Sequence, residues 1–562
     1  MDWIYSLLRW LDESPLRYEW IAWSVFAGTL ASAIAVRQTA GPGIARRSNL
    51  IFASGIVLTL FAFRWPSWFV PTDFNPDEAQ IVAGAITLKS FPIYWKYVDG
   101  TTHGPLCELP LVLAAWIGAP LNYVTARVVA ALLQAVSLIG VWRTVGCLAS
   151  ERTARLAVIP GLAFWAFATT GEFVHYASEL TGLTLLSVAV WAFARGMAAK
   201  GSGNAAVGWI FCSGVALGAV PFAKLQSVPQ ALALALVAGI ILWQKPPSAS
   251  TTRGKLVWSL IAGGLLVPAI IAAFLLMYGL VGQFRTSYIL SGIDYANSGN
   301  RLREMPNRFL GFALSGYSFA WFLAGASAFV LLYLRPSQNV SGRLRLAFAA
   351  GWIQLAAALA CVLLPGRESP HYLHLLIVPV SLLVGLILAR ASAEIENQAD
   401  QTRRSMSLFA VFIGLTLVPQ IVQRSSTPDF VGKFAQNRST RSSAASFILE
   451  RAKPTDTLAM WGWEPNLYVE TGLPQGTREA HSALEIATTP LQAFYLSRYV
   501  GDLNRRQPAW FVDAVGPGGF MYFDRALYGH EMHARLKQSI ADDYEFVGEF
   551  ENKRIYHRRA QR

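Results

Sequence analysis

Long apolar runs alternate with short polar connections along most of the chain. Runs long enough to cross a bilayer, roughly 17 to 25 residues each, lie at 20–36, 49–65, 122–142, 156–171, 177–194, 205–223, 228–243, 256–278, 312–334, 346–364, 372–389 and 406–421. This pattern predicts an α-helical polytopic membrane protein with about twelve transmembrane helices. The apolar stretch 106–120 is shorter and contains Pro110 and Pro120, so we expect a re-entrant or interfacial helix there.

From about residue 422 the pattern becomes that of a soluble protein. Residues 440–453 and 526–544 have helical periodicity, and short apolar segments typical of buried strands lie at 456–463, 508–515 and 554–559. The sequence therefore predicts a transmembrane domain at residues 1–421 and a small soluble α/β domain at residues 422–562.

Composition agrees with a membrane protein. The chain has 562 residues, of which 54% are hydrophobic and 14% charged, whereas soluble domains carry about 25% charged residues. The net charge of +13 is explained by basic loops, so we expect membrane lipids rather than nucleic acid as partners. The four cysteines, Cys107, Cys147, Cys212 and Cys361, have no metal-type spacing. The N-terminus lacks the basic leader and short apolar core of a cleavable signal, and none is expected.

Basic residues divide the connecting loops into two sets. Lys and Arg concentrate at 37–47, 143–155, 195–200, 245–255, 335–345 and 390–404. By the positive-inside rule these loops face the cytoplasm. We therefore expect a large loop at 66–121, both chain ends and the C-terminal domain on the opposite, extracytoplasmic side.

The segment "NPDEAQ" in the large loop carries two adjacent carboxylates, Asp77 and Glu78. Asn75 can cap a helix that begins at Pro76, and the two acids then occupy its first turn in a capping-box arrangement. That structural interpretation explains the spacing, but it does not explain why the helix begins beside the membrane in a long loop. A carboxylate there is also well placed as a general base, and both interpretations stay open.

Histidines and further carboxylates are predicted on the same side. His103 precedes Gly104-Pro105, where a sharp turn can present its side chain at the membrane surface, although a polar turn histidine explains it equally. Glu172, His175 and Glu179 have the spacing of one helical face. They predict either a site for a divalent cation such as Mg²⁺ or Mn²⁺ or a hydrogen-bonded polar cluster, and no cofactor is required.

Several cations also lie on this side, where the charge rule disfavours them. Lys224 lies in a short connection between two apolar runs, and Arg367, His371 and Tyr372 precede another run. A lysine of this kind can extend to the interface without any function. Together with Arg285, however, these residues predict a receptor for a phosphate group.

In order and layout these motifs resemble the GT-C glycosyltransferases that use polyprenyl-phosphate sugars, such as lipid A aminoarabinose transferases and protein O-mannosyltransferases. The likeness covers roughly residues 49–421 and rests on "PDEAQ", "HGPL", "FAKLQ" and "PHYLHLLIVP". It implies that Asp77 is the catalytic base or orients the acceptor, that Glu78 supports it, and that basic residues dock the donor phosphate. Many relatives have Lys where this chain has Gly104, so His103 or Lys224 is expected to replace that contact. An additional span also precedes the usual first one.

The resemblance implies a hexosyl- or pentosyltransferase in the plasma membrane, the inner membrane of a bacterium. A sugar would pass from a polyprenyl-phosphate donor to a hydroxyl of a glycan, lipid or protein acceptor on the extracytoplasmic side. Since polyprenyl phosphate is a good leaving group, we expect a single displacement with inversion, in which cations stabilise the leaving group and Asp77 deprotonates the acceptor.

The sequence pattern also allows two alternative functions. A transporter of a polar or lipid-linked substrate also fits about twelve spans, but transporters place their polar groups near the bilayer midplane rather than at one face. A membrane receptor with an extracytoplasmic ligand-binding domain leaves Asp77, Lys224 and His371 unexplained.

Overall fold

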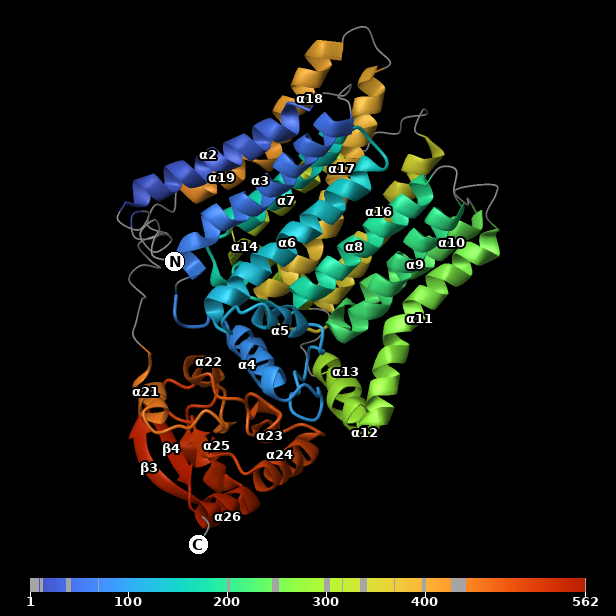
Figure 1. Ribbon diagram of the computed structural model, residues 1–562. Helices are drawn as coiled ribbons and strands as arrows, with labels where there is room; N and C mark the ends of the chain where they lie inside the picture. Colours follow the sequence, from blue (N-terminus) through green and yellow to red (C-terminus); the bar gives the residue numbers. More distant parts are fainter. Residues whose placement is uncertain are drawn as a thin grey trace.

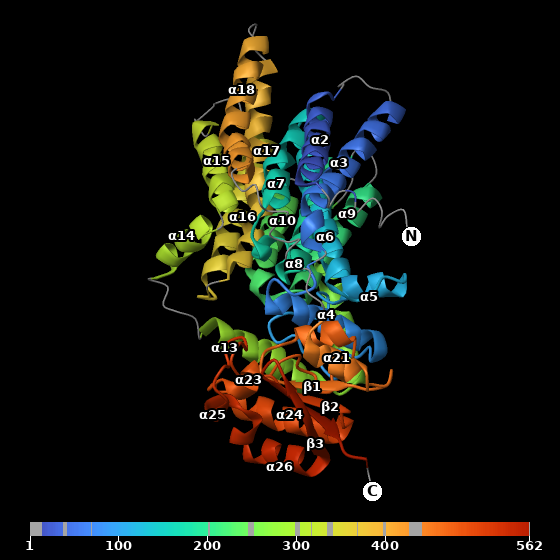
Figure 2. The ribbon, with the colours of Figure 1, turned by 90° about the vertical axis from the view of Figure 1, so that its left-hand side faces the viewer.

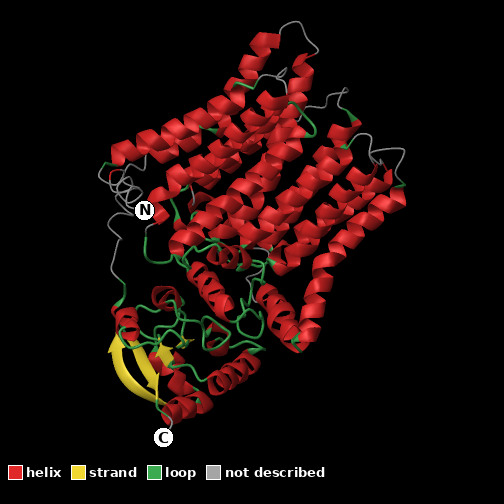
Figure 3. Ribbon diagram, viewed as in Figure 1, coloured by secondary structure: helices red, strands yellow, loops and turns green. Residues whose placement is uncertain are grey.

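The computed structural model describes residues 10, 14–36, 42–68, 70–199, 203–244, 252–297, 304–315, 317–333, 341–367, 369–396, 401–425 and 441–560. The helices of the apolar part run side by side as a bundle, and all strands lie in the C-terminal part (Figures 1 and 3). Parts of the predicted basic loops, including Arg37, Lys200, Lys245 and Arg335, lie outside the described residues.

Each predicted apolar run coincides with a helix. The long helices are α2 (Pro15–Ile34), α3 (Pro42–Trp68), α6 (Tyr123–Gly146), α7 (Glu151–Phe167), α8 (Glu179–Ala198), α9 (Gly203–Ala219), α10 (Val228–Gln244), α11 (Arg253–Met277), α15 (Tyr317–Tyr333), α16 (Gly342–Leu363), α17 (His374–Glu396) and α18 (Gln401–Thr416). Among the described residues, nine helices are long and apolar enough to cross a membrane. The number of spans stays a prediction.

Several short helices lie between or continue the long ones, most of them at the polar end of the bundle. They are α4 (Pro76–Ser90), α5 (Leu109–Trp116), η1 (Gly171–Phe173), η2 (Val220–Phe222), η3 (Leu225–Ser227), α12 (Val281–Gln283), the π-helix η4 (Phe284–Leu290), α13 (Ser291–Asn297), α14 (Met305–Ser315), η6 (Pro370–Leu373) and α19 (Val418–Ser425). Helix α5 is the short helix predicted within 106–120. Helices α4 and α5 lie between the bundle and the C-terminal domain (Figures 1 and 2).

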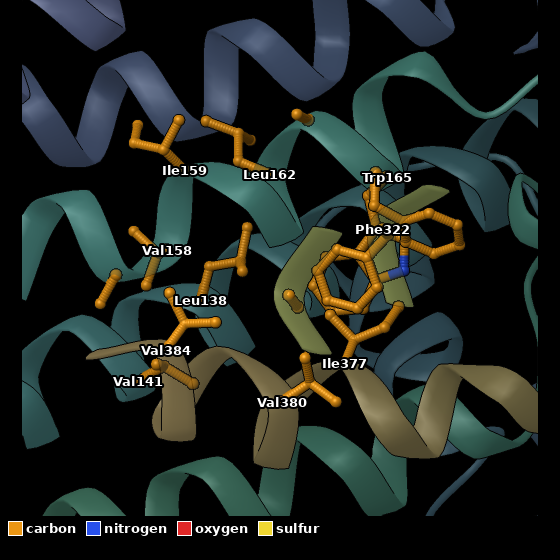
Figure 4. Close-up of a cluster of buried hydrophobic side chains, with 14 of the residues drawn as sticks. Leu138, Val141, Val158, Ile159, Leu162, Trp165, Phe322, Ile377, Val380 and Val384 are labelled. Carbon is orange, nitrogen blue, oxygen red and sulfur yellow. The ribbon is translucent and has the colours of Figure 1, made fainter. Parts of the chain in front are cut away.

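The bundle packs around α17, which is buried along its apolar length. Ile377, Val380 and Val384 of this helix contact the core that Leu138 and Trp165 build from α6 and α7 (Figure 4). A helix that is apolar on all sides is stable only inside a protein or a membrane, and α17 has the composition of such a helix. The N-terminal end of α17 packs against α7, where Trp165 donates a hydrogen bond to His374, and the preceding η6 contacts η1.

The C-terminal part, residues 441–560, is an α/β unit. Its helices are α21 (Ser443–Leu449), α22 (Asn466–Thr471), α23 (Ala483–Ile486), α24 (Gln492–Arg506), α25 (Arg525–Tyr528), η7 (His530–Met532) and α26 (Ala534–Asp543), and its strands are β1 (Leu458–Trp461), β2 (Trp510–Asp513), β3 (Tyr544–Phe550) and β4 (Lys553–Arg558). Strands β1 and β2 are parallel, β4 is antiparallel to β2, and β3 is antiparallel to β4. The sequence located β1, β2 and β4 but missed β3, and it predicted one helix over 526–544 where α25, η7 and α26 lie.

Candidate active site

The N-terminus of α4 presents Asp77 at the polar end of the bundle. Asn75 caps the helix, since its Oδ1 accepts a hydrogen bond of 3.0 Å from the backbone N–H of Asp77, and Pro76 occupies the first turn. The side chain of Asp77 remains 35% exposed. The predicted Asn75 cap is therefore confirmed, whereas Glu78 accepts from the N–H of Phe74 and not from that of Asn75, as a capping box requires. The cap leaves the Asp77 carboxylate accessible at the positive end of the helix dipole.

Glu78, the neighbouring acid, is fully buried and anchors the helix. Its two oxygens accept hydrogen bonds of 3.0 and 2.8 Å from Arg127 of α6, and the backbone N–H groups of Phe74 and Tyr176 donate to it as well. Arg127 also donates to three carbonyls at the end of α3 and in the loop that follows it, those of Ser67, Val70 and Thr72. Because this carboxylate reaches no solvent, the support that Glu78 was expected to give Asp77 takes the form of holding α4 in place.

Asp77 faces a histidine and a second carboxylate. The Nε2 of His371 lies 3.9 Å from Asp77 Oδ2, and its Nδ1 lies 2.7 Å from Glu172 Oε2. Glu172 also accepts a hydrogen bond of 3.1 Å from the side chain of Asn75. Burial alone would raise the pKa of Glu172, but the hydrogen bond with His371 and the nearby His175 lower it to about 2. An ionised Glu172 fixes His371 as a donor at Nδ1 and directs Nε2 toward Asp77.

Lys224 is the buried cation of this region. Its Nζ lies 2.9 Å from Glu179 Oε1 and donates a hydrogen bond of 2.6 Å to the hydroxyl of Ser178. Burial acts to lower the pKa of Lys224, but Glu179 and Asp77 outweigh it and raise the pKa above its ordinary value. The ammonium group is therefore charged close to Asp77, where it can attract an anion.

Tyr372 lies beside Lys224, and Tyr295 links it to Arg367. The Lys224 Nζ lies 5.8 Å from the centroid of the Tyr372 ring, and the hydroxyls of Tyr372 and Tyr295 are 2.7 Å apart. The guanidinium of Arg367 lies 4.7 Å from the centroid of the Tyr295 ring, and its side chain is exposed. The structure thus brings together Asp77, Glu172, Glu179, Lys224, His371 and Tyr372, with Arg367 at the edge of the group. We call these residues the polar cluster.

The segment that carries His175 differs from the prediction. Residues 171–173 form the 3₁₀ turn η1 and α8 begins only at Glu179, so Glu172, His175 and Glu179 do not lie on one helical face. Arg64 of α3 holds the segment by donating to the carbonyls of Trp165, Phe173 and Val174. The sequence missed Arg64 because it lies near the end of an apolar run.

A divalent cation does not fit these three residues. Glu172 is bonded to His371 and Asn75, Glu179 is paired with the Lys224 ammonium, and the Nδ1 of His175 lies 3.0 Å from the carbonyl of Gly171. His371 and Lys224 thus already bond to the carboxylate oxygens that a metal would need as ligands. The prediction of a metal site here is therefore wrong, and the alternative of a hydrogen-bonded polar cluster describes the residues.

Elsewhere in the described part of the chain, Asp513, His530 and Glu531 are close enough together to be metal ligands. Arg525 Nη1 lies 2.9 Å from Asp513 Oδ2, and Arg554 Nη1 lies 2.9 Å from Glu531 Oε1. Because two guanidinium groups already balance both carboxylates, this group does not fit Mg²⁺ or Mn²⁺ either.

The backbone of His103 pairs with that of Lys224, but the His103 side chain is bonded to Glu108 rather than to a residue of the polar cluster. His103 is buried, with its Nε2 2.8 Å from Glu108 Oε1, so the expectation that it faces the membrane surface is wrong. The backbone of its loop instead supports Lys224, because Gly104 N–H donates to the carbonyl of Ala223 at 2.9 Å. A Cβ on Gly104 would lie 2.3 Å from the carbonyl oxygen of Phe222, so only glycine fits. Arg285 is exposed on η4, and no ion pair joins it to the acids of the cluster among the described residues.

The C-terminal domain borders the cluster through buried charges that the sequence did not reveal. Arg498 of α24 lies 2.7 Å from Asp99 of the large loop and also pairs with Glu479. The N–H of Asp99 donates to the carbonyl of Arg478, whose guanidinium donates to the carbonyl of Trp95. Burial lowers the pKa of His481 to about 4, and the Asp77 charge acts on it in the opposite direction. The part of this domain that contains His481 therefore lies close to Asp77.

No protein-family model and no curated protein sequence matches the chain. Among solved structures, the chain is similar to ArnT from Cupriavidus metallidurans bound to undecaprenyl phosphate, with 13% identity, a TM-score of 0.55, and coverage of 91% of this chain and 99% of that chain. The apo structure of the same protein gives 12% identity, a TM-score of 0.57, and coverage of 91% and 98%. An oligosaccharyltransferase from Archaeoglobus fulgidus has 12% identity and a TM-score of 0.41 over 82% of this chain and 68% of that chain. Since the ArnT likeness spans almost the whole of both chains, this protein has the same fold as ArnT.

Proposed function

We propose that the protein is a membrane glycosyltransferase that moves a sugar from a polyprenyl-phosphate donor to an acceptor hydroxyl. The observation that carries this function is an accessible carboxylate, Asp77, held at a helix N-terminus beside the cations Lys224 and His371. The ArnT structure of the same fold contains undecaprenyl phosphate, which supports a lipid phosphate as the donor carrier.

Asp77 would act as the general base. As the acceptor oxygen attacks the anomeric carbon of the sugar, its proton passes to the Asp77 carboxylate and the bond between that carbon and the phosphate oxygen breaks. Attack from the face opposite the leaving group inverts the anomeric centre in one displacement. Neither Glu78 nor Glu179 can replace Asp77, because both are buried and paired with cations.

Lys224 and His371 would bind the phosphate. The bond electrons leave with the polyprenyl phosphate, whose negative charge rises in the transition state, and a fixed positive charge lowers the energy of that state. Glu172 holds His371, while Tyr372 and Arg367 supply further contacts at the edge. We do not assign His103 to this role, since its side chain is bonded to Glu108, nor Arg285, which forms no ion pair with the acids of the cluster among the described residues.

We further propose that the transmembrane domain, residues 1–421, carries these groups on its extracytoplasmic side, with the C-terminal domain, residues 422–562, on the same side. The basic loops at the opposite end of the bundle support this orientation. A cysteine at the exposed position Gln538 should react in intact cells with a maleimide that cannot cross membranes. Reaction only after the membrane is opened would reverse the orientation.

Sugar transfer by purified protein tests the function. With lipid-linked sugars extracted from cells that lack the protein as donors, the Asp77→Asn variant should lose transfer by at least about a hundredfold, the usual contribution of a general base, and still bind undecaprenyl phosphate. Asp73→Asn, a neutralised acid in the same loop, is the matched control and should keep transfer. Transfer that survives in Asp77→Asn but not in Asp73→Asn would move the base to Asp73.

A further inference from the structure

An apolar groove opens at the end of the bundle that lies opposite the C-terminal domain. The groove encloses about 230 Å³ between α6, α8, α10, α16 and α17. Figure 1 labels these five helices. Side chains that line it include Phe193, Met197, Leu234, Ile241, Leu346 and Leu386. The helices that form it are long apolar helices of the bundle, so the groove lies at membrane depth and lipid is the natural source of an occupant.

The groove has a basic mouth. Arg343, at the start of α16, lines it, is exposed, and forms no ion pair with any residue that the structure describes. Cys147 also lines it, and its thiol donates a hydrogen bond of 3.3 Å to the carbonyl of Arg143 one turn earlier on α6. The nearby carboxylate of Glu151 is already engaged by Arg155 and Trp142. Among the described residues, the positive charge of Arg343 at this mouth is therefore balanced by no carboxylate.

An apolar groove with a basic mouth suits a ligand that has a hydrocarbon chain and an anionic headgroup. Basic pockets between transmembrane helices on the cytoplasmic side bind anionic lipid headgroups, whereas a neutral lipid gains nothing from the charge. The volume is below the roughly 300 Å³ of a typical cofactor site, which suits a narrow hydrocarbon chain. The isoprenoid chain of a sugar donor is a poorer match, because its phosphate is expected at Lys224, at the other end of the bundle.

We propose that this groove binds an acyl chain of an anionic phospholipid, with the lipid phosphate held by Arg343 at the basic end of the bundle. The lipid would fill the space between α16 and its neighbours and stabilise the folded protein by mass action. This site is separate from the polar cluster and does not depend on the proposed transfer reaction.

Native mass spectrometry of the full-length protein in neutral detergent tests the site. Dioleoyl phosphatidylglycerol and dioleoyl phosphatidylcholine are matched probes, since they share acyl chains and differ in charge. The first should bind one molecule per chain more tightly and raise the thermal unfolding midpoint more than the second. Arg343→Gln should weaken phosphatidylglycerol binding about fivefold, whereas Arg345→Gln, on another face of the same helix, should not.

A second variant tests the apolar part. Ala347 lines the groove, and Ala347→Phe should fill it, so this variant should gain no stability from added phosphatidylglycerol. Should Ala347→Phe fail to fold, Arg343→Gln still decides the matter because its side chain is exposed. Equal phosphatidylglycerol affinity in wild type and Arg343→Gln, or displacement of this lipid by an equal concentration of undecaprenyl phosphate, would overturn the proposal.

Discussion

The ammonium group of Lys224 lies 2.9 Å from Oε1 of Glu179, and both side chains are almost completely buried. The pair joins the connection between α9 and α10 to the first residue of α8. A buried charge is tolerated only with a partner, so each residue keeps the other ionised. Lys224 therefore has two functions to separate, one in the fold and one in binding phosphate.

A double variant separates these functions. Lys224→Met alone leaves Glu179 buried and unpaired and should destabilise the protein by about 3–5 kcal/mol. Lys224→Met with Glu179→Gln removes both charges, so most of that stability should return. Phosphate binding should not return, and the Kd for undecaprenyl phosphate should be at least about tenfold weaker than in wild type, as for the loss of a charge-assisted hydrogen bond. Wild-type affinity in the double variant would reduce Lys224 to a structural residue.

The pair of Glu78 and Arg127 should behave differently, because it positions α4 and faces no solvent. Arg127→Met should destabilise by about 3–5 kcal/mol, since it leaves a buried carboxylate and three backbone carbonyls without their donor. Glu78→Gln removes a charge but keeps an acceptor, so it should cost less. Thermal unfolding in detergent measures both, and a more stable Arg127→Met than Glu78→Gln would contradict this assignment.

The sequence could not show which residues pair with Lys224 and with Glu78, and so could not distinguish the roles of these two buried ion pairs. The apolar runs predicted the helices, and the charge pattern predicted that Asp77, Lys224 and His371 would lie at one face, because spans and loop charges follow from local composition. Arg127 lies inside a predicted span, and its partner Glu78 is distant in the chain. The 3₁₀ turn at 171–173 depends in the same way on Arg64 from another helix. Side-chain pairing of this kind is set by tertiary packing, which periodicity does not encode.

Glu172 predicts a pH dependence of stability. Its pKa in the folded protein is about 2, below the usual 4.5, so the unfolded chain binds more protons than the folded one over this range. Its contribution is therefore fully present above about pH 4.5 and is lost as the pH falls toward about 2. Thermal unfolding midpoints across this window should fall less steeply in Glu172→Gln than in wild type. Glu450→Gln, which neutralises an exposed acid, should follow the wild-type curve, and identical curves for all three proteins would contradict the assignment.

Arg498 should control how the C-terminal domain is held against the large loop. Arg498→Met leaves Asp99 and Glu479 as buried carboxylates that face each other without a cation, so the contact should open. We expect faster amide hydrogen exchange at 95–103 and 475–483, and a lower kcat for transfer with unchanged affinity for undecaprenyl phosphate. Arg505→Met on the same helix is the matched control, because that arginine is 66% exposed and its partner Asp502 keeps both hydrogen bonds from Arg478. If Arg498→Met and Arg505→Met exchange at the same rate in both segments, the domain is held by its other contacts and Arg498 does not control the arrangement.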